Sequence, residues 1–174
     1  MRKYAITGLA ALALGWAPLA ALAPPLAPPL PGGQAESAPS DPSQLSAESL
    51  RDMLSGMGYE PKKLSKGFLL AIKQDDWTIN LQVVLSSDKR KMGLNANLGK
   101  VDDPGAVPAD TWLQLLIRNG DLDPSAFYYD KDQKKLYLHR SFDNRNVSPA
   151  ILRKEIENFA SNVRSSSDLW KFTK

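Results

Sequence analysis

Three consecutive stretches of the chain alternate between apolar and polar residues, and this pattern constrains the fold more than any other feature. The clearest stretch runs from Trp77 to Leu85, where every second residue is apolar. Residues 67–73 and 92–98 repeat the pattern on either side of it. A period of two is that of a β-strand with one buried face and one wet face. The turns between the stretches are too short for crossovers, so we expect an antiparallel meander.

Helical patterns lie around these strands. One follows Ser46 and ends at Gly58, a second covers residues 108–119 with Gly120 as its stop, and a third starts at Ser148-Pro149. Two further strands are expected at about residues 126–130 and 134–140. The order α-β-β-β-α-β-β-α predicts an α+β domain, in which helices cover one face of an antiparallel five-stranded sheet.

The start of the chain differs from the rest. Residues 1–23 read as a signal peptide or N-terminal anchor, because Arg2 and Lys3 precede an uncharged run that ends in Ala21-Leu22-Ala23. Pro24 disfavours cleavage at that point, and Gly33-Gln34-Ala35 offers a second site, so cleavage and retention both stay open. Residues 24–45 read as a Pro/Ala/Ser-rich tether and residues 46–174 as the folded domain. The expected location is outside the cytoplasm, periplasmic or secreted.

Composition excludes several classes of function. The chain has no cysteine, which rules out disulfides and thiolate chemistry. Of its 22 basic residues two lie in segment 1–23, which leaves 20 against 19 acidic residues. A balance so close to neutral gives no electrostatic basis for binding nucleic acid.

No residue pattern indicates catalysis. His139 is the single histidine, so no second histidine is there to bind zinc with it. No serine stands in a nucleophile turn that could form a triad with it. Its alternation with Leu136 and Leu138 places it on the wet face of a strand. The acidic pairs stand in turns, where aspartate has a local structural role. We therefore predict no catalytic, cofactor-binding or metal-binding residues, and no cofactor.

The middle helix is more apolar than packing on a sheet requires. Its apolar residues cover most of the helix circumference. Either the helix is sunk in the core, or one side of it faces a second subunit. The predicted interface residues are Trp112, Leu113, Leu116 and Ile117.

The last third of the chain carries a resemblance to known proteins. Lys135-Leu136-Tyr137-Leu138-His139-Arg140-Ser141-Phe142-Asp143-Asn144-Arg145 is followed by a helix that starts at Ser148-Pro149 and ends near Leu169-Trp170. With the element order over residues 46–170, this phrase resembles the class I chaperones of type III secretion systems and the YbjN-type domain. The resemblance implies a non-enzymatic fold that often dimerises and binds a polypeptide along its surface. Those chaperones are typically acidic and cytoplasmic, whereas this chain is near neutral.

The resulting hypothesis is a non-enzymatic, exported binding module with a chaperone-like or regulatory role. Its expected partners are a protein or peptide and a second copy of the chain. Nucleic acid is not an expected partner. Association with a membrane is expected only through an uncleaved N-terminal segment. The alternative is an envelope domain that binds a small ligand in a cleft between the sheet and the helices.

Overall fold

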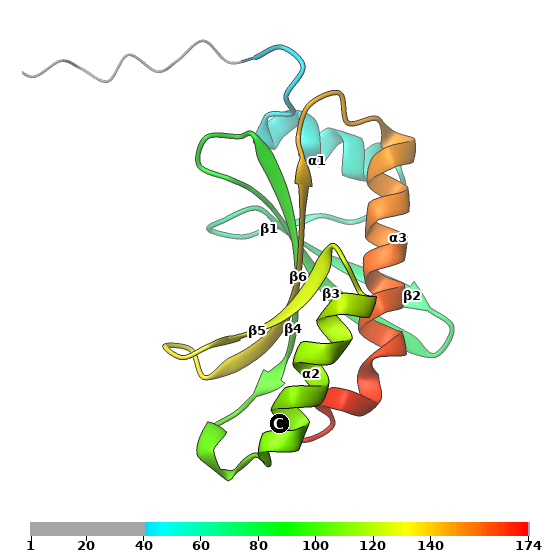
Figure 1. Cartoon of the computed structure of the whole chain (residues 1–174). Coiled ribbons are helices and arrows are strands. Elements are labelled where there is room, and N and C mark those ends of the chain that lie inside the picture. The colour runs from blue at the N-terminus through cyan, green and yellow to red at the C-terminus, as the bar shows by residue number, and fades with distance from the viewer. Residues whose placement is uncertain (1–40, 174) are drawn as a thin grey trace, which may run out of the picture. The chain divides into compact units, whose positions relative to one another are not determined.

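The structure is a computed structural model that describes residues 41–173 (Figure 1). The predicted signal peptide or anchor, residues 1–23, and the predicted tether up to residue 40 lie outside the described residues. Short 3₁₀ helices, η1 (Pro104–Ala106) and η2 (Ser167–Trp170), precede the second helix and follow the third. The other elements of the described range are α1 (Ala47–Gly56), β1 (Lys62–Lys63), β2 (Phe68–Gln74), β3 (Trp77–Leu85), β4 (Lys91–Lys100), α2 (Ala109–Asp121), β5 (Ser125–Asp130), β6 (Lys135–Asp143) and α3 (Pro149–Ser165).

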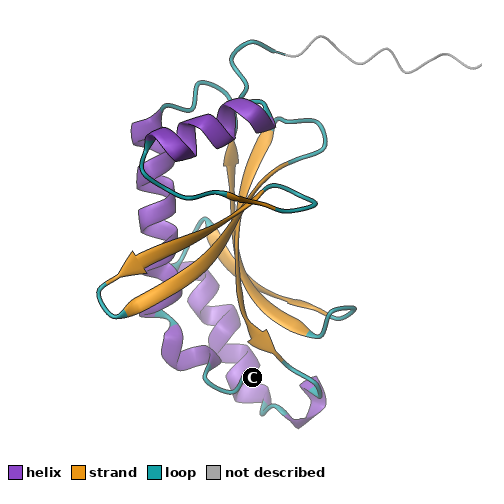
Figure 2. Ribbon diagram, turned by 180° about the vertical axis from the view of Figure 1, so that it is seen from behind, coloured by secondary structure: helices purple, strands orange, loops and turns teal. Residues whose placement is uncertain are grey.

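The strands of residues 41–173 form one antiparallel sheet in the order β1-β2-β3-β4-β6-β5. The helices lie along one side of it (Figures 1 and 2). The α+β class and the antiparallel sheet are confirmed. The predicted number of five strands is wrong, because β1 adds a sixth. Both residues of β1 are exposed, so it has no apolar alternation by which the sequence could reveal it.

Alternation along each strand divides the sheet into a buried face and an open face. In β3, Leu81 and Val83 are fully buried, whereas Asn80 between the apolar positions is exposed. Burial of such a side chain contributes about 1.5–3 kcal/mol. The stripe of α3 that covers the buried face consists of Leu152, Ile156, Phe159, Ala160 and Val163.

The helix starts follow the predicted caps. Ser46 accepts a hydrogen bond from the Ser49 amide, and the Ser49 side chain accepts one from the Ser46 amide. Ser148 caps α3, with Pro149 at the first helical position. The predicted stop of the middle helix is wrong, because α2 continues through Gly120 to Asp121.

The chain after α3 closes the end of the core beside α2. Trp170 meets Trp77 edge-on with ring centroids 6.3 Å apart, and Phe172 meets Trp112 at 5.7 Å. The Thr173 hydroxyl donates to the Leu98 carbonyl at 2.7 Å. The alternation of β3 predicts a buried Trp77, which is wrong, since this side chain is 37% exposed. It stands at the turn that begins β3, where Trp170 covers it from one side.

Residues just before α1 are tied to the end of β6. Gln44 bridges to Arg145, and the Asn146 amide donates to the Ser43 carbonyl at 2.8 Å. The Asn144 side-chain amide donates to the carbonyls of Leu45, at 3.0 Å, and of Lys89, at 2.8 Å. The end of the predicted tether, residues 24–45, thus contacts the domain. Within residues 41–173, no helix is long and apolar enough to cross a membrane.

Candidate functional site

The outer edge of β2 is paired only where it begins. β1 contributes two pairs, Lys62 with Leu69 and Lys63 with Phe68. From Leu70 to the end of the strand, β2 is paired with β3 on its inner side, and no strand within residues 41–173 lies on its outer side. An edge of this kind presents backbone donors and acceptors that another chain can pair with.

The ladder between β1 and β2 shows which residues present those groups. The Leu64 amide donates to the Gly67 carbonyl at 3.0 Å, in register with the two pairs above. Hydrogen-bonded and non-bonded pairs alternate in an antiparallel ladder, so Leu69 directs its amide and carbonyl towards β1. The amides and carbonyls of Ala71 and Lys73 point in the same direction, beyond the end of β1. Their backbone groups therefore face outward where no strand of the described range stands.

A groove of about 760 Å³ lies beside this edge. The segment before β1, the outer part of β2 and the first half of α3 line it, together with one residue of β3. Lining side chains of both charge signs include Lys62, Lys73, Arg153 and Glu157. The groove is therefore able to contact both an extended backbone and charged side chains.

Contacts of α3 hold the wall of the groove that faces β2. The Arg153 guanidinium donates to the Met57 carbonyl at 2.9 Å and lies 5.8 Å from the centre of the Tyr59 ring. Burial raises the pKa of Tyr59, so its hydroxyl remains a neutral donor at neutral pH. Gln74 is also among the lining residues, and within residues 41–173 its Oε1 atom is buried without a hydrogen-bond partner.

The opposite edge of the sheet is occupied at Phe127. On β5, the Asn119 side chain accepts from the Phe127 amide at 2.7 Å and donates to the Phe127 carbonyl at 3.4 Å. The carboxamide of a helix residue thus occupies the backbone groups that another strand would need. The two edges therefore differ, since β2 is open at Ala71 and Lys73 beside a groove, whereas α2 occupies the β5 edge at Phe127.

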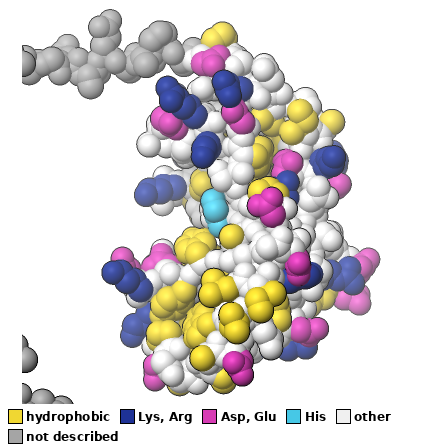
Figure 3. All heavy atoms as spheres, in the orientation of Figure 1, with side chains coloured by type: hydrophobic (Ala, Val, Ile, Leu, Met, Phe, Trp, Pro, Cys, Tyr) yellow, Lys and Arg dark blue, Asp and Glu magenta, His cyan; other side chains and the backbone are white. Residues whose placement is uncertain are grey.

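The predicted interface residues of α2 divide between two sides of the helix. Leu113, Leu116 and Ile117 are 54%, 66% and 63% exposed, and hydrophobic side chains gather over α2 in Figure 3. Trp112 instead packs inward, against Tyr129 and Phe172, and its indole donates to the Pro104 carbonyl at 3.3 Å. We call Leu113, Leu116 and Ile117 the outer face of α2. Whether a second subunit covers this face stays a prediction.

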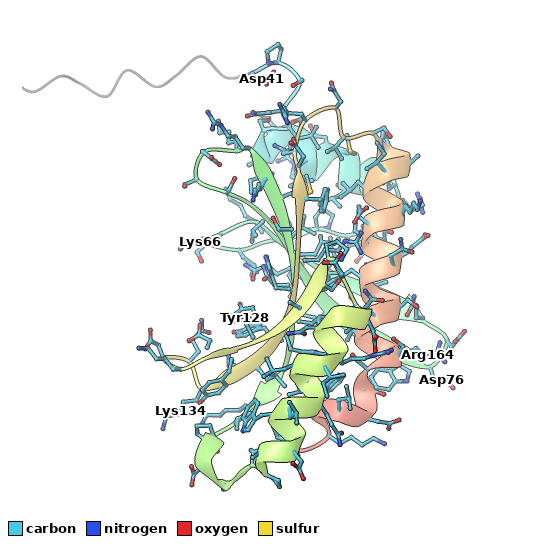
Figure 4. All side chains as sticks on the ribbon, in the orientation of Figure 1. Asp41, Lys66, Asp76, Tyr128, Lys134 and Arg164 are labelled. Atoms are coloured by element: carbon cyan, nitrogen blue, oxygen red, sulfur yellow. The ribbon has the colours of Figure 1, made fainter. Side chains whose placement is uncertain are left out.

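Aromatic side chains gather on the open face of β5 and β6. Tyr128 and Tyr137 stand opposite each other and stack at 5.2 Å, with an angle of 12° between the rings. Tyr128 lies on the side of these strands that faces away from α2 and α3 (Figure 4). His139 meets Tyr128 edge-on at 6.2 Å. We call Tyr128, Tyr137 and His139 the aromatic group.

The surroundings of His139 give it a structural partner and no catalytic one. Its Nδ1 lies 2.8 Å from the Asn95 side-chain oxygen across the β4–β6 ladder. Burial lowers the pKa of His139, which keeps the ring neutral at pH 7. In the described residues no three His, Cys, Asp or Glu side chains are grouped so as to hold a metal ion.

No protein-family model matches the sequence, and no curated protein sequence matches it. Solved structures match the fold. The complex of ExsC with ExsE matches with a TM-score of 0.52 and 13% identity, over 71% of this chain and 92% of that chain. The ExoU–SpcU complex from the type III secretion system of Pseudomonas aeruginosa matches with a TM-score of 0.51 and 18% identity, over 71% of this chain and 99% of that chain. The HopA1–SchA chaperone–effector complex matches with a TM-score of 0.50 and 16% identity, over 68% of this chain and 90% of that chain.

The chain has the fold of the type III secretion chaperones. The resemblance that the sequence predicts is confirmed at the level of the fold. YbjN of E. coli, which represents the other group in that prediction, matches with a TM-score of 0.47. The chaperone fold also corrects the predicted location. A periplasmic or secreted location is contradicted, because the secretion chaperones that share the fold are cytoplasmic. Residues 1–23, on which that prediction rested, lie outside the described residues.

Sequence reasoning did not find the open edge of β2 within the chaperone fold. The alternation of Phe68, Leu70 and Ile72 predicts the strand but gives no sign of where its neighbour ends. A weak signal exists in the segment Glu60-Pro61-Lys62-Lys63, since proline followed by exposed lysines is typical of an edge strand.

Proposed function

We propose that this protein is a non-catalytic, chaperone-like module that binds another polypeptide by adding an extended segment of it to the edge of β2. The observation that carries the proposal is the outward orientation of the Ala71 and Lys73 backbone beside a groove, with no strand of the described range against them. Addition of a strand to a sheet edge is a common mode of peptide recognition, in which backbone hydrogen bonds give affinity and pockets select side chains.

The groove supplies what strand addition needs besides the backbone. Lys62 and Lys73 lie near the edge, and Arg153 and Glu157 lie across it on α3. Long charged side chains can contact acidic and basic residues of a bound segment through their heads and apolar residues through their stems. The fold supports the proposal, because HopA1–SchA, which shares it, is a chaperone–effector complex.

A small-ligand site is the competing interpretation of the same groove. Its volume of about 760 Å³ falls within the usual range for small ligands. However, ligand pockets are mostly apolar, whereas charged residues line much of this groove. An extended chain at an open strand edge therefore fits the geometry better.

We further propose that two copies of the chain associate through the outer face of α2. Leu113, Leu116 and Ile117 are more than half exposed and adjacent on one helix. An apolar surface of this kind is typical of an interface.

Strand addition can be tested with a phage-displayed library of random 12-residue peptides, selected on the immobilised full chain. Ala71→Pro removes an outward amide and keeps the strand backbone, since proline is tolerated at an edge. Ala71→Val is the matched control, because it retains the amide and favours a strand. We expect the peptides enriched on the wild-type protein to bind the valine variant and to lose at least tenfold in affinity for the proline variant. Equal binding to a folded proline variant would overturn the proposal.

A further inference from the structure

Two lysines flank the free part of the β2 edge on the open face of the sheet. Leu69, Ala71 and Lys73 alternate with the buried residues of β2, so their side chains point to this face. Lys62 is paired with Leu69, and directly opposed residues share a face, so Lys62 points there too. Ala71, whose side chain is a single methyl group, lies between the two lysine positions. Both lysines are exposed and line the groove.

The charges of these lysines are not neutralised within the part of the chain that the structure describes. Neither Lys62 nor Lys73 forms an ion pair with any residue of the range 41–173. Glu60 also lines the groove, but it precedes the ladder and is not paired with either lysine. Two ammonium groups therefore stand against one carboxylate, and this rim of the groove is positive.

The opposite wall of the groove, on α3, presents a free carboxylate. Arg153 on this wall is held against the Met57 carbonyl and the Tyr59 ring. Glu157, one helical turn further on, is exposed and has no hydrogen bond or ion pair with any residue between 41 and 173. The groove thus has a positive rim on the side of the open face and an available acid on the side of the helix.

The two sides of a strand added to β2 would meet these two charges separately. Its residue opposite Ala71 would point to the open face, about 7 Å along the strand from the position of Lys62. Lys73 would be its diagonal neighbour, at a distance that long side chains bridge. The next residue of the added strand, opposite Ile72, would point to the other side, where α3 carries Glu157.

We infer that the polypeptide bound at the β2 edge carries an acidic residue opposite Ala71 and a basic residue at an odd spacing from it, facing Glu157. This inference rests on the proposed function. A slip of one residue would turn the basic side chain towards the lysines and the acidic one towards Glu157. The charges therefore select the register of the bound segment by repulsion as well as by attraction.

The test uses the same random 12-residue peptide library, selected on the immobilised full chain. Lys73→Glu reverses a charge on the open face. Its matched control is Lys66→Glu, in the exposed turn between β1 and β2 and outside the groove lining (Figure 4). Glu157→Gln removes the carboxylate on α3. Its control is Asn158→Lys, which makes the same change of net charge at an exposed neighbour that does not line the groove. Circular dichroism confirms that each variant is folded.

We expect peptides enriched on the wild-type protein to place acidic and basic residues at spacings of one or three at least twice as often as at spacings of two or four, relative to the unselected library. Lys73→Glu should lower the frequency of acidic residues by about two- to fivefold, as the loss of an exposed ion pair would. Glu157→Gln should lower that of basic residues by a similar factor, and both controls should match the wild type. No preference for odd spacings, or variants that select as their controls do, would overturn the inference.

The proposed function and this inference fail in different ways. If enriched peptides lose affinity for Ala71→Pro but show no preference for odd spacings, strand addition stands and the charge pattern is wrong. If the wild-type protein enriches no peptide, or its peptides bind a folded proline variant equally well, the proposed function fails and the inference fails with it.

Discussion

The carboxamide of Asn119 on α2 bonds both backbone groups of Phe127 on β5, accepting from the amide at 2.7 Å and donating to the carbonyl at 3.4 Å. One side chain thereby ties the helix to the sheet and occupies the strand edge at Phe127. A helix side chain that occupies an edge in this way protects it from pairing with another copy.

Asn119→Ala should therefore have two effects. Loss of the bonds leaves part-buried backbone groups unsatisfied, so unfolding in urea should show a loss of about 1–3 kcal/mol. The freed edge should also promote association that grows with concentration, measured by light scattering. Asn158→Ala, at an exposed position of α3, is the control and should change neither quantity. A stable variant with no added association would show that Asn119 does not protect the edge.

The outer face of α2 and Trp112 should respond differently to substitution. Leu113→Ser with Ile117→Ser changes exposed residues, so circular dichroism and the melting temperature should stay close to wild type. The mass in size-exclusion chromatography with light scattering should fall from dimer to monomer. Trp112→Ala should instead cost about 2–4 kcal/mol, because it removes the contacts with Tyr129 and Phe172. A wild-type protein that is monomeric at high micromolar concentration would rule out the dimer.

Alanine substitutions at two glycines should change the stability of the domain in opposite directions. Gly67 has φ +80, and a Cβ added to it would lie 2.0 Å from the Val83 carbonyl oxygen. Gly67→Ala should therefore destabilise the domain by more than about 3 kcal/mol, because neither the backbone conformation nor the space suits a side chain. Gly120 lies within α2, and nothing would stand within 4 Å of its added Cβ. Gly120→Ala should stabilise by about 0.5–1 kcal/mol, and urea unfolding measures both.

His139 gives the folded state a dependence on pH. Burial lowers its pKa below the ordinary value of 6.5, so between the folded and unfolded pKa values the unfolded chain binds more protons. The contribution of His139 to stability is therefore present above pH 6.5 and falls as pH drops towards the folded pKa. NMR titration of this single histidine should show a midpoint below 6.5. His139→Gln should remove the corresponding slope from the stability profile, and a midpoint at or above 6.5 would contradict the burial.

Local periodicity was sufficient to predict most of the fold. The alternation around Leu81 predicts β3 at the bounds it has, and Ser148-Pro149 predicts the start of α3. β1 escaped prediction because two exposed lysines carry no periodic signal. Its absence from the prediction matters, because the place where β1 ends determines which part of β2 is open.

The functional surfaces depend on contacts between distant parts of the chain. The apolar residues around α2 left open whether the helix is sunk in the core or faces a partner, and they assign no side to Trp112. That side is decided by Tyr129 and Phe172, which lie far along the sequence. The Asn119–Phe127 bonds likewise depend on how α2 docks on β5, which no local pattern specifies.

The tail that packs against Trp77 and Trp112 has a consequence for synthesis of the protein. A ribosome makes the chain from the N-terminus, so α2 emerges well before Trp170 and Phe172, which complete the packing at that end of the core. Until then Trp112 lacks one of its two aromatic neighbours, and α2 is held to the sheet mainly through β5. The packing around Trp112 is therefore complete only after residues 167–173 have been added.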